Sequence, residues 1–573
     1  MAGSRFSVKS FLLATFLHST LLPQAHAAYP YCLPGDACFP SDNEIQNFNN
    51  TVNGRLIKSV PYGAACYKAA YDAETCKALA AVKEDVFYRQ ALPAGVMYTN
   101  WEQEGTAGCP VPDPPSNGSY PSPVEGDCTL GGMSAYVVNA TSADDVAKAV
   151  KFAAKYNLRF RVKNSGHDYT GRSSGAGAFS VWTRYMNDAK LESGFKPCSS
   201  SLAQDVLSAG PGVNIEELFA WGGQNGVVTI GGFTTTVGAT GGYVLGGGTG
   251  PLGPMFGMGV DNVVQYEVVT ADGEEKIVNE CTNQDLFWAM RGGGGTFAVV
   301  TRVYIRTYPA FKAVNTIAGQ IACANYSAYS ELIGRLVDLQ LPMRNAGHTA
   351  CEQLGIVLLS VLPFTNGTSQ NPNETLKIMQ PVLNVPGCQS GLRARQFTGK
   401  SSWNDAYQAV IWPIVRTGSR VGVNLADFSR LISYELINSE KRMKGAKEYI
   451  LNLPHDVPFI WQNTVGEATK KISPDATSMH PDWRNAFAFV DVPTFGPWSG
   501  VTAAQLETAQ AVLDNATAVF GTATYYNEDY ILEKNWQESM FGSNYARLLE
   551  IKRTVDPNGL FNCRQCVGSE NGY

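Results

Sequence analysis

The chain has 573 residues, a formal net charge of −6 and a pI near 5.7. This length predicts more than one domain, and the acidic balance argues against nucleic acid or an anionic membrane as a partner. The sequence contains no His-x-x-x-His or His-x-His pattern, which argues against a metal site.

The first residues are typical of a secretory leader. Arg5 and Lys9 supply positive charge, residues 11–22 are apolar, and the small-x-small motif AHA ends at Ala27. We predict cleavage after about Ala27 and secretion. The apolar run is too short for a membrane anchor, and no later stretch is long and apolar enough to span a bilayer.

Two further features favour secretion. Thirteen cysteines in an oxidising compartment predict disulfides, with at least one cysteine left over. The local pairs that we consider are Cys32 with Cys38, Cys66 with Cys76, Cys109 with Cys128, and the Cys563-x-x-Cys566 motif, for which a structural disulfide is favoured over zinc. Sequons for N-linked glycans start at Asn49, Asn117, Asn139, Asn325, Asn366, Asn373 and Asn515. No motif indicates an oligomeric state.

A helix, a strand and a glycine-containing loop follow in the first half of the chain. Ser142 and Asp145 form a capping-box-like pair at the start of the helix, and an apolar stripe of helical spacing follows it. Residues 158–162 are predicted to form a strand. The loop VKNSGHDYTGRS (162–173) comes next and carries His167. Successive N–H groups in such a loop can bind a pyrophosphate.

Two more segments are rich in glycine. TTTVGATGGYVLGGGTG (234–250) is too glycine-dense for an ordinary helix or strand and suggests a backbone lying close to something flat. DLFWAMRGGGGTF (285–297) leads into an apolar strand. Between the loops we expect a helix over residues 215–221 that Gly222 and Gly223 end, and a hairpin with an Asp-Gly turn over residues 263–279. Farther on, residues 425–436 are predicted to be helical.

These three segments, with the C-terminal run FGSNYARLLEIK (541–552), resemble the FAD-linked oxidases of the vanillyl-alcohol-oxidase superfamily, in the berberine-bridge-enzyme-like and oligosaccharide-oxidase branch. The resemblance covers roughly residues 125–310 and 520–566. It implies an α+β fold, with a two-part FAD-binding domain of the PCMH type and an antiparallel-sheet substrate domain backed by helices. The implied domains are a leader at 1–27, an N-terminal extension at 28–124, the FAD-binding domain at 125–310, the substrate domain at 311–520 and a returning segment at 521–573.

The same resemblance implies an FAD joined covalently to His167. Some relatives have a second link through a cysteine, but Thr234 stands at about that place and no cysteine lies between Cys198 and Cys281, so we predict a single link. The cofactor-binding residues expected with His167 are Asn164, Ser165, Gly166, Asp168, Tyr169, Thr170, Ser173, Thr234, Gly238, Gly241, Gly242, Tyr243, Gly248, Val299 and Asn544.

The implied activity is removal of a hydride from an alcohol, sugar or natural product, with electrons passed to O2 and release of H2O2. Val237 matches a small residue over the flavin that is typical of oxidases. Relatives carry a catalytic tyrosine in Tyr-x-Asn-Tyr, whereas this chain has Tyr525-Tyr526-Asn527-Glu528. The base is therefore Glu528, one of Tyr525 and Tyr526, or a residue of the middle domain. The alternatives to an oxidase are an FAD dehydrogenase or oxidative cyclase of secondary metabolism, and a non-catalytic glycoprotein.

Overall fold

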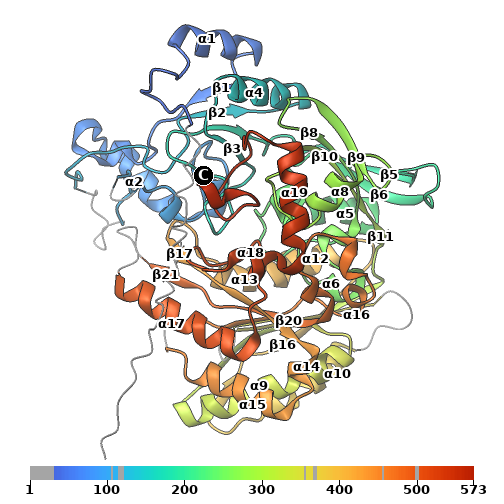
Figure 1. Cartoon of the computed structure of the whole chain (residues 1–573). Coiled ribbons are helices and arrows are strands. Elements are labelled where there is room, and N and C mark those ends of the chain that lie inside the picture. The colour runs from blue at the N-terminus through green and yellow to red at the C-terminus, as the bar shows by residue number, and fades with distance from the viewer. Residues whose placement is uncertain are drawn as a thin grey trace, which may run out of the picture.

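The computed structural model describes residues 31–104, 107–113, 122–353, 357–364, 371–454, 457–496 and 503–572. The predicted leader at 1–27 lies outside these residues, and so do the sequons at Asn117 and Asn366. In Figure 1, helices α1 (Asp42–Thr51) and α4 (Ala143–Lys155) lie at one end of the molecule, and α9 (Tyr326–Asn345) and α15 (Glu440–Leu451) lie at the other.

The first half of the chain forms two main sheets. In the four-stranded sheet β2, β4 and β3 run parallel and β1 is antiparallel at one edge. The five-stranded sheet is antiparallel throughout and contains the predicted Asp-Gly hairpin as β8 and β9. Their strands, in sheet order, are β1 (Leu56–Lys58), β2 (Tyr136–Asn139), β4 (Phe179–Trp182) and β3 (Phe160–Lys163), then β5 (Ala189–Phe195), β6 (Gln204–Ala209), β10 (Val299–Arg306), β8 (Val263–Val269) and β9 (Glu275–Asn279).

Helix α4 joins these two sheets. The Ser142 side chain accepts a hydrogen bond from the backbone N–H of Asp145, so the predicted cap is confirmed. The apolar stripe of the helix is fully buried, with Val146 and Val150 packed in one cluster with residues from both sheets. Burial of this stripe stabilises the orientation of β3, which leads directly into the His167 loop.

The middle of the chain forms a larger antiparallel sheet covered by helices on one face, as expected for the substrate domain. Its strands in order are β15 (Cys388–Ser390), β12 (Ala313–Cys323), β14 (Val357–Phe364), β13 (Thr349–Gln353), β19 (Ile460–Asn463), β20 (Ala486–Asp491) and β18 (Ser429–Ser433), with β16 (Arg393–Thr398) also paired to β12. Helices α9, α15 and α17 (Ala503–Phe520) bury Leu336, Ile450 and Leu513 in one core cluster.

Successive side chains of β19 and β20 point alternately into the core and into a cavity. Trp461 and Val490 belong to the core under the helices, whereas their neighbours Gln462 and Asp491 line the cavity on the opposite face. Successive side chains of a strand point to opposite faces. The α+β fold class is confirmed, while the exact domain boundaries stay predictions.

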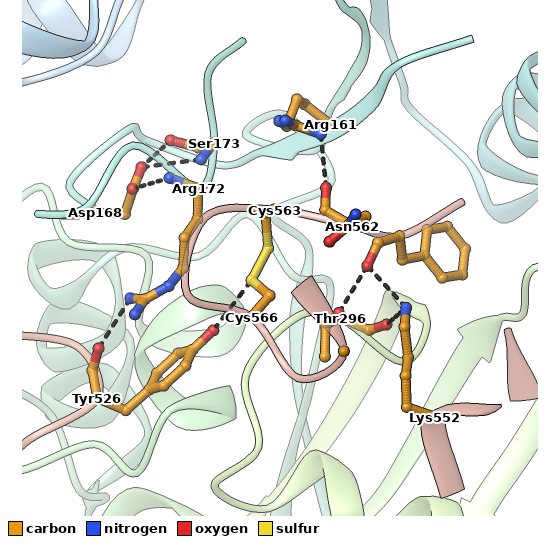
Figure 2. The surroundings of a disulfide bond; sticks show 12 residues. Arg161, Asp168, Arg172, Ser173, Thr296, Tyr526, Lys552, Asn562, Cys563 and Cys566 are labelled. Carbon is orange, nitrogen blue, oxygen red and sulfur yellow. Dashed lines mark hydrogen bonds between the residues drawn. A yellow bond between two sulfur atoms is a disulfide. The ribbon is translucent and has the colours of Figure 1, made fainter. Parts of the chain in front are cut away.

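The C-terminal helix α19 (Tyr545–Val555) returns to the first half of the molecule, as the resemblance implies for the segment 521–573. Lys552 donates hydrogen bonds to the backbone oxygens of Thr296 and Phe561 and to the Asp556 carboxylate. Figure 2 shows this ammonium group joining the end of the chain to the glycine-rich segment before β10.

Two local predictions were wrong. Residues 425–436 are not one helix: they contain β17 (Asn424–Ala426), β18 and the short α14 (Tyr434–Ile437). Pairing of β18 with β20 prevails over the helical spacing there. Helix α5 (Ile215–Asn225) continues through the two glycines and ends at Gly226, whose φ of 68° suits glycine.

Six disulfides are formed. The three predicted local pairs and the Cys563–Cys566 bridge are confirmed. The other two join Cys198 to Cys281 and Cys323 to Cys388. The thirteenth cysteine, Cys351, keeps its thiol.

Candidate active site

A cavity of about 370 Å³ lies between the two halves of the molecule. The His167 loop and the glycine-dense segment form one part of its wall, the inner face of the large sheet forms another, and residues 525–528 also contribute. The predicted site residues that line it are Asn164, Ser165, Gly166, His167, Asp168, Tyr169, Ser173, Thr234, Val237, Gly238, Gly241, Gly242, Tyr243, Val299, Tyr525, Tyr526 and Glu528.

Three predicted site residues are absent from the cavity wall that the described residues outline: Thr170, Gly248 and Asn544. Thr170 is fully buried. Gly248 lies behind the wall, where its N–H donates to the Tyr525 hydroxyl at 3.0 Å. The Asn544 amide donates to the backbone oxygen of Met479 at 2.7 Å, so it joins two loops.

The His167 loop holds its shape through its own hydrogen bonds. The Asp168 carboxylate accepts from the backbone N–H groups of Arg172 and Ser173, and Gly166 adopts a φ of 84° that favours glycine. His167 is half-buried and its Nε2 shares a hydrogen bond with Thr236 Oγ1 at 2.6 Å. Burial lowers the pKa of His167 to about 3, so the imidazole is neutral at physiological pH.

The glycine-dense segment packs against Asn164 of that loop. A Cβ at Gly238 would lie 2.4 Å from Asn164 Nδ2, and one at Gly241 would lie 2.6 Å from it. Any larger residue at these two positions would collide with the Asn164 amide, which explains two of the glycines in the segment. At these positions the backbone lies against that flat amide group. At Gly242, by contrast, a Cβ would meet no atom within 4 Å in the described part of the chain.

Tyr526 is held from both sides (Figure 2). The Arg172 guanidinium lies 3.8 Å from the centre of its ring and donates to its backbone oxygen at 2.9 Å. The phenol oxygen is 3.7 Å from Cys566 Sγ of the C-terminal disulfide. A Cβ at Gly294 would lie 2.1 Å from the same oxygen, which explains one glycine of the third motif. Tyr526 therefore joins the loop, the disulfide and the glycine-rich turn.

Tyr525 is fully buried, and several donors surround its hydroxyl oxygen. The backbone N–H of Gly248 and the Asn527 side-chain amide donate to it at 3.0 Å and 2.8 Å. Burial raises the pKa of this phenol further above its ordinary value. The phenol is therefore fixed in place and neutral.

Glu528 lies at the turn where the chain enters the cavity wall. Its N–H donates to the Tyr525 backbone oxygen at 2.9 Å, and its own backbone oxygen accepts from Ser429 Oγ. Its carboxyl group is hydrogen-bonded to that of Asp491, and burial raises the pKa of Glu528 to about 7. A carboxyl with such a pKa can accept a proton at neutral pH.

Sequence reasoning missed the other acids of this wall. Asp427 and Asp491 are buried, and burial together with the charge of Glu528 raises the pKa of both. Gln462 and Cys351 line the cavity beside them. Asp427 follows β17 and Asp491 ends β20. No sequence motif marks either residue, because only the pairing of the sheet brings them to the cavity.

Among the described residues, no group of three or more His, Cys, Asp or Glu side chains is arranged to hold a metal ion. Within the same ranges, no helix is both long and apolar enough to cross a membrane. Trp288 packs in the main core and Trp536 packs against its edge.

Known proteins share this fold and these segments. A model of the FAD binding domain matches residues 134–279, and a model described as berberine and berberine-like matches residues 524–568. The VAO-type flavoprotein oxidase VAO615 of Thermothelomyces thermophilus is 31% identical over 563 residues, which cover 95% of this chain and 94% of that protein.

Two solved structures extend the comparison. The crystal structure of the VAO-type flavoprotein MtVAO615 from Myceliophthora thermophila C1 matches with a TM-score of 0.79 and 29% identity, over 94% of this chain and 97% of that one. Glucooligosaccharide oxidase from Acremonium strictum, described with a 6-S-cysteinyl, 8α-N1-histidyl FAD, shares the fold at a TM-score of 0.60 and 20% identity, over 77% of this chain and 92% of that one.

The fold and the matched domains define an FAD-linked oxidoreductase. More narrowly, the chain belongs to the vanillyl-alcohol-oxidase family of flavoproteins, in its berberine-bridge-enzyme-like branch.

Proposed function

We propose that the protein is a secreted oxidase that takes a hydride from a small-molecule substrate and passes the electrons to O2, with release of H2O2. The observation that carries this proposal is that one cavity contains His167, Val237 and the Glu528 carboxyl group. A cofactor anchor, a small residue beside the expected flavin position and a proton acceptor are the parts that such an oxidation needs.

The residues of the loop fit an FAD. Asn164 Oδ1 is buried at the cavity and has no hydrogen-bond partner among the described residues, so it is an acceptor that a ligand can satisfy. Gly242 leaves open space where any other residue would place a Cβ. Bound FAD would supply the hydride acceptor and the site at which O2 is reduced.

His167 is the proposed covalent anchor. Its neutral imidazole can act as a nucleophile, and the contact of Nε2 with Thr236 leaves Nδ1 for a bond to the flavin 8α-carbon. The relative from Acremonium strictum carries a histidyl FAD with an additional cysteinyl link. We propose only the histidyl link here, because Thr234 lines the cavity where that cysteine is expected.

Glu528 is the proposed base. It takes the proton of the substrate hydroxyl as the hydride leaves the neighbouring carbon, and its pKa of about 7 suits this transfer near neutral pH. Tyr525 is less suited because its oxygen already accepts from Gly248 and Asn527. Tyr526 is less suited because its phenol group contacts the Cys563–Cys566 disulfide.

Secretion and glycosylation belong to the same proposal. The sequons at Asn325, Asn373 and Asn515 lie on exposed side chains that a glycan could reach. Treatment with an endoglycosidase should lower the apparent mass of protein purified from the culture medium. An unchanged mass would remove the glycan part of the proposal and leave the enzymology intact.

The first test is an absorbance spectrum before and after acid precipitation. Flavin bands near 450 nm that remain with the pellet support a covalent FAD, and His167→Ala should release the colour into the supernatant. A colourless protein would overturn the proposal. Bleaching by a substrate under anaerobic conditions without H2O2 in air would instead favour a dehydrogenase or cyclase.

The role of Glu528 is tested separately with Glu528→Gln, which should lower turnover by about 10²–10⁴-fold. The variant should keep its covalent flavin, because Glu528 lies outside the His167 loop. Unchanged turnover would remove Glu528 as the base and return the role to a tyrosine or to another cavity residue.

A further inference from the structure

The imidazole of His167 has a single hydrogen-bond partner among the described residues. Its Nε2 lies 2.6 Å from Oγ1 of Thr236, and its Nδ1 forms no hydrogen bond within the same ranges. This Nδ1 is also not one of the buried polar atoms that lack a partner, so it is open to the cavity that His167 lines. One hydroxyl group therefore sets the orientation of the ring and the position of its proton.

Thr236 lies behind the cavity wall. Its side chain is fully buried, and it is absent from the wall that the described residues outline, whereas Thr234 and Val237 on either side of it line the cavity. The Thr236 hydroxyl can act on a ligand in the cavity only through His167. Any role that it has in the chemistry is therefore that of a positioning residue.

The backbone around Thr236 is anchored to the start of helix α5. The backbone N–H of Ile215 donates to the Val237 oxygen at 3.0 Å. The N–H of Glu216 donates to the Thr235 oxygen at 3.1 Å. These two N–H groups belong to the first turn of the helix and have no partner inside it. Both neighbours of Thr236 are thus held by the helix, which fixes the hydroxyl beside the ring.

A hydroxyl group suits this place because it can both accept and donate a hydrogen bond. When it accepts from Nε2–H, the lone pair of the neutral ring is on Nδ1, which is open to the cavity. When Nδ1 carries a substituent, the same hydroxyl can donate to Nε2. A side chain that only donates would hold the opposite tautomer, and a carboxylate would favour the charged imidazolium, which has no lone pair to react.

Resting on the proposed histidyl FAD, we propose that Thr236 is the positioning residue for covalent attachment, because it keeps the proton of the neutral imidazole on Nε2 and directs the Nδ1 lone pair to the flavin. In this step the bond between Nδ1 and the 8α-carbon replaces one C–H bond of that carbon and the N–H bond of the ring. The two electrons and two protons that are released reduce the flavin, and O2 takes them up as H2O2.

A purely structural role predicts a different result. If Thr236 only satisfied a buried imidazole, its removal would lower the free energy of unfolding and leave the bond to the flavin unchanged. If Thr236 sets the tautomer, its removal leaves a site that still binds FAD but attaches it poorly. The share of flavin that is covalently bound separates these two roles, and it is measured without any substrate.

The experiment compares the unaltered protein with Thr236→Val and Thr236→Ser, each purified with its flavin and then precipitated with acid. Valine has nearly the shape of threonine without its hydroxyl, and serine keeps the hydroxyl. We expect Thr236→Val to lower the share of flavin in the pellet at least five-fold, while its total flavin stays within two-fold of the unaltered protein. Thr236→Ser should keep the share of the unaltered protein.

Thr235→Val is the matched control. Thr235 is the neighbouring residue and is also buried, but its hydroxyl donates to the Glu216 carboxylate at 3.0 Å and not to His167. Its backbone bond to helix α5 does not depend on the side chain. The share of covalent flavin should therefore stay as in the unaltered protein.

Three results would overturn the proposal: full covalent flavin in Thr236→Val, loss of covalent flavin in Thr236→Ser as in the valine variant, or an equal loss in Thr235→Val. A variant that fails to fold does not remove the test, because the unaltered protein gives a second one. Proteolysis and NMR of the flavin-bearing peptide should identify Nδ1 of His167 as the linked nitrogen. A link through Nε2 would overturn the proposal.

The outcomes separate this inference from the oxidase function. Covalent flavin that depends on Thr236, without H2O2 formation from any substrate, would leave the positioning role intact and remove the oxidase function. Flavin that acid releases completely from the unaltered protein, together with H2O2 formation from a substrate, would do the reverse.

Discussion

Buried acids occur in two settings in this molecule. Three buried acids of the scaffold are each paired with a buried cation: Glu102 with Arg89 at 2.7 Å, Asp261 with Arg484 at 2.8 Å, and Asp556 with Lys552 at 2.5 Å. In the cavity wall, burial and the charge of Glu528 raise the pKa of Asp427 and Asp491, and desolvation raises the pKa of the half-buried Glu528. No described cation forms an ion pair with any of the three.

The difference shows where the chain gives up stability for function. A buried charge without a partner costs several kcal/mol, and the group stays protonated instead. The scaffold pairs avoid that cost within the chain, whereas the cavity acids avoid it only by holding protons or by binding a ligand. We therefore interpret the unpaired acids as part of a binding site.

Breaking a scaffold pair should have the largest effect on stability. Glu102→Gln leaves the Arg89 guanidinium charged and buried, and it weakens the hydrogen bonds that the carboxylate accepts from Tyr62 and from the Val96 backbone. We expect the free energy of unfolding to fall by roughly 3–5 kcal/mol. Urea unfolding followed by tryptophan fluorescence measures this, and a loss below about 1 kcal/mol would contradict the contrast between the two settings.

Removing a cavity acid should increase the free energy of unfolding at high pH, whereas breaking a scaffold pair lowers it. The pKa of Glu528 is raised from 4.5 to about 7 in the folded protein. Between these values the folded state keeps a proton that the unfolded state has lost, so this contribution to stability is complete below pH 4.5 and is lost as the pH rises through 7. Glu528→Gln should therefore be more stable than the unaltered protein at pH 8, by roughly 1–3 kcal/mol, and equal to it near pH 4.

Thermal unfolding of both proteins from pH 4 to pH 8, with the flavin bound, checks this prediction. Asp491→Asn should give a difference of the same sign, because its pKa is also raised. A variant that loses stability at pH 8 would show that the Glu528 carboxylate has a partner after all.

Adding a cation to the cavity wall should give one of its acids an ion-pair partner, as the buried acids of the scaffold pairs have. Gln462 donates its side-chain amide to Asp491, so Gln462→Lys would place an ammonium group beside that carboxylate. The fall in stability between pH 4.5 and pH 7 should become smaller by about 1 kcal/mol, because the new charge lowers the pKa of Asp491. Gln462→Met, of similar length and without charge, should keep the original pH dependence.

The sequence pointed to the His167 loop and to Glu528, both of which line the cavity, but it marked neither Asp427 nor Asp491, for a physical reason. The residues of the His167 loop are neighbours in the chain, and local rules for glycine and loops place them together. Asp427 and Asp491 are 64 positions apart in the numbering and meet only through the pairing of β18 with β20. The segment 425–436 was predicted to be helical, and Leu425, Phe428 and Ile432 do have helical spacing. Strand pairing prevails there instead.

The smallest effect should come from an ion pair that is not buried. Lys68 and Glu125 are 3.0 Å apart, but their side chains are 70% and 74% exposed. Water screens both charges and solvates either one when the other is removed. Glu125→Gln should therefore change the free energy of unfolding by no more than about 0.5 kcal/mol at any pH from 5 to 8. Both variants are measured in the same urea titration. The comparison shows whether the loss of stability in Glu102→Gln comes from leaving a buried charge without a partner or simply from losing an ion pair. If the two variants lost similar stability, the cost would come from losing any ion pair, and the unpaired acids of the cavity would no longer indicate a ligand.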